Sequence, residues 1–68
     1  MERFYVNNNA QVNGDHEVHR DGCVWLPKIV SKKDLGYHTS CMNAVNEAKK
    51  TYRQSNGCAT CCPFCHTS

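Results

Sequence analysis

Hydrophobic residues in this chain occur in short runs interrupted by polar residues, and each run predicts a different element. Phe4-Tyr5-Val6 predicts a β-strand that stops at Asn7-Asn8-Asn9, because asparagine favours turns. Asn13-Gly14 is a strong hairpin signal, and residues 16–19 would form the return strand with Val18 pointing inward. The first part of the chain is therefore expected to form a β-hairpin.

The middle of the chain predicts extended and irregular backbone. Cys23-Val-Trp-Leu-Pro27 is the densest apolar stretch, and Pro27 keeps the preceding residue out of the helical region. Trp25 is expected to be the main anchor of the core. Residues 28–33 predict a basic connecting loop, and residues 35–38 predict a short strand.

One amphipathic α-helix is predicted at about residues 40–55. Ser40 is a good N-cap, and Asn56-Gly57 tolerates the left-handed backbone that ends many helices. Apolar residues recur with the helical period at Cys41, Ala44, Val45, Ala48 and Tyr52. The expected fold class is α+β: an N-terminal hairpin or short sheet, one C-terminal helix and a cysteine-rich end, forming one small domain over residues 1–68.

The composition indicates that packing alone gives this domain a marginal core. The chain has 68 residues, of which 40% are hydrophobic even with six cysteines included. A chain this short buries only about 60% of its unfolded surface, so a metal ion or disulfides are expected to add stability. The formal net charge of +2 is too mild to indicate a nucleic-acid or membrane partner.

The expected location decides between metal and disulfides. The N-terminus contains no apolar run that resembles a signal peptide, and no segment is long enough to predict a transmembrane helix. A cytoplasmic protein is therefore predicted, and clustered cysteines in a reducing compartment bind metal more often than they form disulfides. The alternative is an extracellular domain in which the cysteines pair with one another.

Two adjacent Cys-x-x-Cys pairs near the C-terminus each have the spacing of half a tetrahedral zinc site. The side chains of Cys61 and Cys62 should diverge, so a single ion is expected to use one pair. Cys62-Pro-Phe-Cys65 is the predicted half-site, because proline after the first thiolate favours a tight turn. Cys58-Ala-Thr-Cys61 remains the alternative.

His19-x3-Cys23 offers the other half-site, about forty residues earlier. The predicted ligands of one structural Zn²⁺ ion are therefore His19, Cys23, Cys62 and Cys65. The remaining cysteines are expected to be buried and free, unless two of them form a disulfide: Cys41, Cys58 and Cys61. The histidines His16 and His38 are expected to be surface or strand residues. His66 adjoins the predicted site as a ligand or a neighbour.

Several of these motifs together resemble the Ada-like metal-binding domain, which occurs in a DNA-repair protein and in many small bacterial proteins. They are Phe4-Tyr5-Val6-Asn7, His19-x3-Cys23, a Ser40-led helix containing Glu47-Ala48, and a glycine-bearing turn into Cys-x-x-Cys. In the repair protein all four zinc ligands are cysteines, and the first accepts a methyl group from a DNA phosphotriester. His19 occupies the matching position here, and imidazole does not perform that thiolate chemistry. The resemblance therefore implies a structural form of the module.

The expected function is that of a monomeric, non-catalytic binding module with an unidentified macromolecular partner. It would present the polar face of the helix or the basic connector Lys28, Lys32 and Lys33. Nucleic acid is one candidate partner, and a membrane is not expected. A thiol–disulfide exchange enzyme using Cys62 and Cys65 is the catalytic alternative, but such motifs normally precede a helix and this one follows it.

Overall fold

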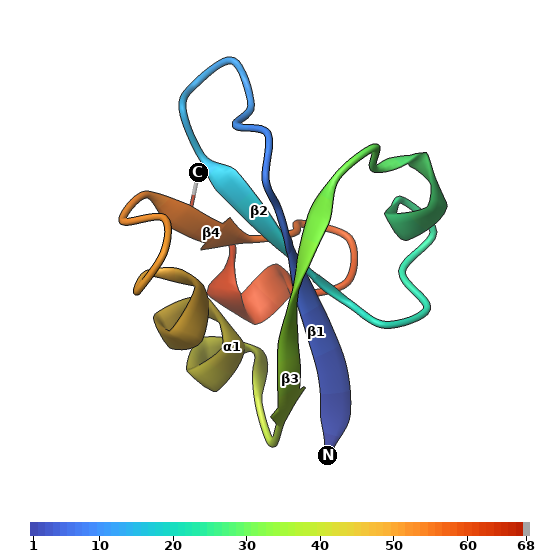
Figure 1. Cartoon of the computed structure of the whole chain (residues 1–68). Coiled ribbons are helices and arrows are strands. Elements are labelled where there is room, and N and C mark those ends of the chain that lie inside the picture. The colour runs from blue at the N-terminus through green and yellow to red at the C-terminus, as the bar shows by residue number, and fades with distance from the viewer. Residues whose placement is uncertain (68) are drawn as a thin grey trace.

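A computed structural model describes residues 1–67, and a mixed four-stranded sheet runs through its centre (Figure 1). The strands are β1 (Glu2–Asn7), β2 (His16–Arg20), β3 (Lys32–His38) and β4 (Ser55–Gly57), in the spatial order β3-β1-β2-β4. Strand β1 pairs antiparallel with β2 and β3, whereas β4 lies parallel to β2. With helix α1 (Cys41–Ala48) on one face of the sheet, the predicted α+β class is confirmed.

The N-terminal hairpin forms as predicted. Tyr5 lies opposite His19, and Val6 lies opposite Val18, which is fully buried. Residues 8–15 make a broader connection than a two-residue turn, and Gly14 adopts a positive φ of 93° within it. Strand β3 is longer than predicted and begins at Lys32, because the backbone of β1 offers hydrogen-bonding groups along its whole length.

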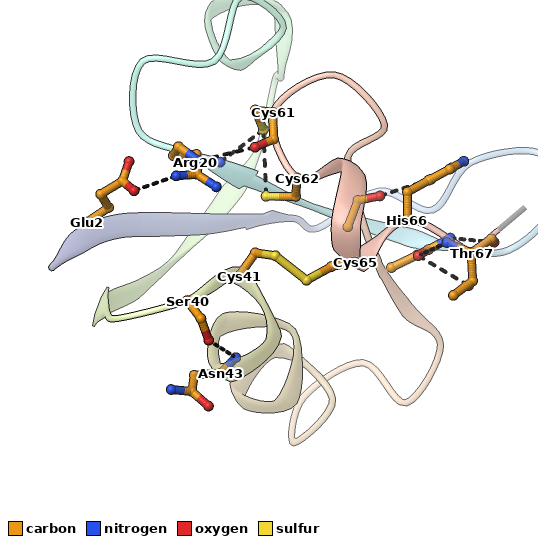
Figure 2. The surroundings of a disulfide bond; sticks show 12 residues. Glu2, Arg20, Ser40, Cys41, Asn43, Cys61, Cys62, Cys65, His66 and Thr67 are labelled. Atoms are coloured by element: carbon orange, nitrogen blue, oxygen red, sulfur yellow. Dashed lines mark hydrogen bonds and ion pairs between the residues drawn. A yellow bond between two sulfur atoms is a disulfide. The ribbon is translucent and has the colours of Figure 1, made fainter.

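The helix begins where it was predicted and ends earlier. The Ser40 hydroxyl accepts a hydrogen bond from the backbone N–H of Asn43 at 3.3 Å, which caps the first turn (Figure 2). The helix stops at Ala48 rather than near residue 55, because residues 55–57 pair with β2 instead. Tyr52 still packs inward, with its ring stacked on His16 at 3.9 Å between centroids.

The two faces of the sheet carry unequal apolar clusters. The helix side holds ten buried residues: Phe4, Val6, Val18, Leu35, Cys41, Ala44, Val45, Ala48, Cys62 and Cys65. The opposite side, beneath the loop that contains the short 3-10 helix Leu26–Lys28, holds only Cys23, Leu26 and Cys58. Trp25 was predicted to anchor the core, but its side chain is 48% exposed and its indole N–H donates to Thr60. Leu26 points inward in its place.

A disulfide joins Cys41, at the start of α1, to Cys65 in the C-terminal 3-10 helix Pro63–Cys65 (Figure 2). It ties the helix to the last turn of the chain on the helix side of the sheet. Cys41 was expected to be a free buried cysteine or one of a pair, and the structure shows it paired. No helix within residues 1–67 has the length and apolar character needed to cross a membrane.

Alanine at Gly57 is expected to destabilise the protein by about 1–3 kcal/mol, a typical cost of overpacking. A Cβ atom there would lie 2.7 Å from the Cβ of Cys65 and 3.0 Å from the carbonyl oxygen of Cys62. Urea unfolding of Gly57→Ala measures the loss. The matched control is Gly22→Ser, where the added Cβ meets nothing within 4 Å and only the positive φ is strained. Equal destabilisation of both variants would contradict the close approach at Gly57.

Candidate metal centre

Parallel pairing of β4 with β2 brings two distant segments of the chain together. Because parallel strands run in the same direction, the loops that leave their C-terminal ends start at the same edge of the sheet. The pair Val18 and Gly57 is the last in this register, and the backbone N–H of Cys58 donates to the carbonyl of Val18 at 2.9 Å. Cys58 therefore lies next to His19, and the following turn adds Cys61.

Four side chains converge at this edge: His19, Cys23, Cys58 and Cys61. One potential ligand atom from each lies within 4.8 Å of the others. His19, Cys23 and Cys58 are buried, and Cys61 is partly exposed. One imidazole nitrogen and three sulfurs form a donor set typical of tetrahedral zinc. The cluster can therefore hold a metal ion.

The imidazole of His19 is oriented by contacts on both of its nitrogens. Nδ1 lies 3.6 Å from the sulfur of Cys23, so it faces the cluster. Nε2 lies 3.2 Å from a carboxylate oxygen of Glu17, and Gln11 donates to the other oxygen of that carboxylate. Metal-binding histidines commonly donate their second N–H to a carboxylate in this way, which fixes the tautomer.

Burial shapes the protonation of the cluster. It lowers the pKa of His19, an effect that the Glu17 carboxylate opposes, so the imidazole is neutral at pH 7, as ligation requires. Burial also raises the pKa of the Cys61 thiol, while the backbone N–H of Arg20, 3.2 Å from its sulfur, acts in the opposite direction. A divalent cation would supply the positive charge that buried thiolates lack.

Of the predicted quartet, the structure brings only His19 and Cys23 into the cluster. Cys62 is fully buried on the helix side, and the sulfur of Cys65 is bonded to Cys41 (Figure 2). In place of the predicted Cys62-Pro-Phe-Cys65, the structure brings the alternative pair, Cys58 and Cys61, next to His19 and Cys23. Pro63 does favour a turn, but this turn carries Cys65 to the disulfide.

The neighbours Cys61 and Cys62 serve different clusters, although their sulfurs are 3.8 Å apart. Cys61 joins the four-residue cluster, whereas Cys62 belongs to the core on the helix side. The signal that could have selected Cys58 is its position directly after Gly57. That signal becomes informative only if residues 55–57 are recognised as a strand beside β2. Three residues are too few to carry a recognisable strand pattern.

The remaining histidines make other contacts. His16 Nδ1 lies 3.0 Å from the carbonyl oxygen of Asn7, and its ring stacks on Tyr52. His38 Nε2 lies 2.7 Å from the carbonyl of Leu35. His66 Nδ1 lies 3.0 Å from the carbonyl of Gly57, and His66 is not part of the four-residue cluster.

Fold and site together define a small α+β domain in which one histidine and three cysteines form a cluster able to hold a metal ion. Comparison of the chain with protein-family models, with curated proteins and with solved structures finds no match.

Proposed function

We propose that this protein is a structural zinc domain in which His19, Cys23, Cys58 and Cys61 bind one Zn²⁺ ion. The observation that carries the proposal is the convergence of four N and S donors from two distant segments within 4.8 Å. Zinc is the ion that fits best, because it favours tetrahedral coordination by thiolate and imidazole. The Ada-like resemblance points in the same direction and rests on the sequence motifs alone.

The proposed zinc is structural rather than catalytic. Four protein ligands fill a tetrahedral shell, whereas catalytic zinc keeps one position open for water. Within residues 1–67, the hydrophobic cluster on this side of the sheet has only three buried residues, so the ion supplies the cohesion that apolar packing does not. Thiol–disulfide exchange at Cys62 and Cys65 is disfavoured, since Cys62 is fully buried and Cys65 pairs with Cys41. The protein is proposed to act as a monomeric, non-catalytic binding module.

The disulfide favours a second candidate, an extracellular domain stabilised by disulfides. Cys41–Cys65 is a pairing typical of oxidising compartments, whereas four unpaired cysteines are typical of reducing ones. The proposed cytoplasmic location rests on those unpaired cysteines. A metal ion and one disulfide can coexist, because they lie on opposite faces of the sheet.

Native mass spectrometry of protein purified without added zinc tests the proposal. The expected neutral mass is that of the chain plus one zinc, less the two protons that Zn²⁺ replaces in the charge balance and the two hydrogens of one disulfide. Metal-free protein with an additional disulfide between two of Cys23, Cys58 and Cys61 would support the extracellular candidate instead. Folded protein with neither zinc nor that disulfide would refute the zinc site.

Replacing Glu17 with glutamine is expected to weaken zinc binding by about 10- to 100-fold, the usual effect of losing a carboxylate behind a histidine ligand. The neutral amide does not stabilise the partial positive charge on Nε2–H of a bound His19. Competition with a chromophoric chelator measures the affinity. The matched control is Glu47→Gln, since Glu47 pairs with Lys50 on the helix side. Equal affinities for the two variants would show that Glu17 does not support the ion.

A further inference from the structure

The sheet face opposite α1 carries aromatic rings that each have a cation above them. We define the aromatic–cation face as Arg3, Tyr5, Trp25, Lys28, Lys32 and Tyr37. The guanidinium carbon of Arg3 lies 5.5 Å from the ring centre of Tyr5 and 5.8 Å from that of Tyr37. Lys32 lies 5.8 Å from the Tyr5 ring, and Lys28 lies 5.2 Å from the Trp25 ring. Each of these three rings therefore has at least one cation close to it.

Strand alternation places the sheet members of this face together. Along β1, Phe4 and Val6 point to the helix, so Arg3 and Tyr5 point to the other side. Tyr37 on β3 pairs with Arg3 and shares its side. Figure 1 shows α1 and the segment around Leu26–Lys28 on different sides of strands β1 and β3.

The loop that carries Trp25 and Lys28 is flanked by two open hollows. One, of about 560 Å³, has Tyr5 and Lys32 on the sheet side and Val24 and Pro27 on the loop side. The other, of about 520 Å³, is lined by Trp25 and Lys28 together with the amide residues Asn7, Asn9 and Gln11. Trp25 is 48% and Tyr37 61% exposed, so both rings are accessible to a partner.

The cations of this face differ in whether a carboxylate pairs with them, since Arg3 pairs with Asp34. Three of the six acidic residues form ion pairs: Glu2 with Arg20, Asp34 with Arg3 and Glu47 with Lys50. Glu17 lies beside the neutral imidazole of His19, and Asp15 accepts hydrogen bonds from Gln54 and Asn56. Within residues 1–67, no carboxylate lies at ion-pair distance from Lys28 or Lys32. Each hollow also has one acidic lining residue that counts against an anionic partner, Asp21 in the larger hollow and Glu17 in the smaller one.

We propose that the aromatic–cation face binds single-stranded nucleic acid, with bases stacked on Trp25 and Tyr37 and phosphates contacted by Lys28 and Lys32. Stacking platforms interleaved with cations bind single strands without a sequence code. An acidic peptide would satisfy the lysines but leave the exposed rings without partners, so nucleic acid fits better. This inference rests on the proposed function, because zinc at Cys23 would hold the Trp25 loop against the sheet.

Fluorescence anisotropy of a labelled oligothymidine of about ten nucleotides tests the inference at low salt. The protein is used with its zinc content measured, so that loss of the metal site and loss of the binding face are distinguished. Trp25→Ala and Tyr37→Ala are each expected to weaken binding by about tenfold. Lys32→Gln should reduce the slope of log affinity against log salt by about 0.7, the value for one phosphate contact.

Matched controls lie away from the aromatic–cation face. Phe64→Ala removes an aromatic ring that is 97% exposed, and Lys49→Gln removes an exposed lysine at the end of α1, so neither should alter the affinity. Quenching of the fluorescence of Trp25, the only tryptophan, is expected on binding. No binding by the zinc-loaded protein, equal losses in the control variants, or equally tight binding of polyglutamate would each overturn the inference.

Discussion

Replacing Cys58 with serine is expected to abolish stoichiometric zinc binding and to leave the protein largely unfolded at neutral pH. Structural zinc contributes an apparent free energy of about 10–16 kcal/mol in small domains, whereas the whole stability of a typical domain is about 5–15 kcal/mol. Cys58 lies between β4 and the cluster and is only 2% exposed, so nothing else replaces its thiolate. Far-UV circular dichroism and the measured zinc content report the two losses.

The matched control is Cys62→Ala, which removes a nearby thiol that lies outside the four-residue cluster. Cys62 is fully buried among the residues of the helix side, so its loss should leave a small cavity and cost about 1 kcal/mol without releasing zinc. The pair of variants separates the two Cys-x-x-Cys half-sites. A Cys58→Ser protein that keeps its zinc while Cys62→Ala loses it would return the ligand assignment to Cys62 and Cys65.

Removing the disulfide is expected to lower the free energy of unfolding by about 3 kcal/mol while zinc stays bound. Cys41 and Cys65 are separated by 24 positions, and closing a loop of that size removes about this much chain entropy from the unfolded state. The double variant Cys41→Ala/Cys65→Ala avoids leaving a free thiol that could mispair. Urea unfolding with zinc in excess measures the difference from the oxidised protein.

The appropriate control for the disulfide is the unaltered protein treated with a thiol-free reductant. If the bond acts by restricting the unfolded chain, the reduced protein and the double variant should have similar stability. The zinc content of both should equal that of the oxidised protein. Loss of zinc from the double variant would show that Cys41 or Cys65 takes part in the metal site after all.

These two expectations follow from how the core is divided. The sheet separates a side with a cluster of ten buried hydrophobic residues from a side with a cluster of three. The proposed metal centre lies on the poorer side, which packing alone holds weakly. The disulfide lies on the richer side, where it joins α1 to the C-terminal 3-10 helix. A domain of 68 residues has little other means of fixing both faces.

Local features of the sequence predicted the elements that depend on local interactions. The hairpin, the Ser40 cap, the buried stripe from Cys41 to Ala48 and the inward Val18 are all confirmed. Each depends on periodicity or on hydrogen bonds between residues close in the chain. The His19-x3-Cys23 spacing likewise indicated two residues that the structure places in one cluster.

Only the tertiary structure decided the end of the helix, the second pair of cluster cysteines, the disulfide and the exposure of Trp25. The helix end, the second pair of cluster cysteines and the disulfide depend on β4. This strand has three residues, and its partner, β2, lies about forty positions earlier in the chain. The backbone of Ser55–Gly57 gains hydrogen bonds by joining β2, and this pairing places Cys58 beside His19 and directs Cys65 towards Cys41. Pairing of that kind depends on backbone groups that every residue possesses, so it leaves no pattern of side chains from which it could be predicted.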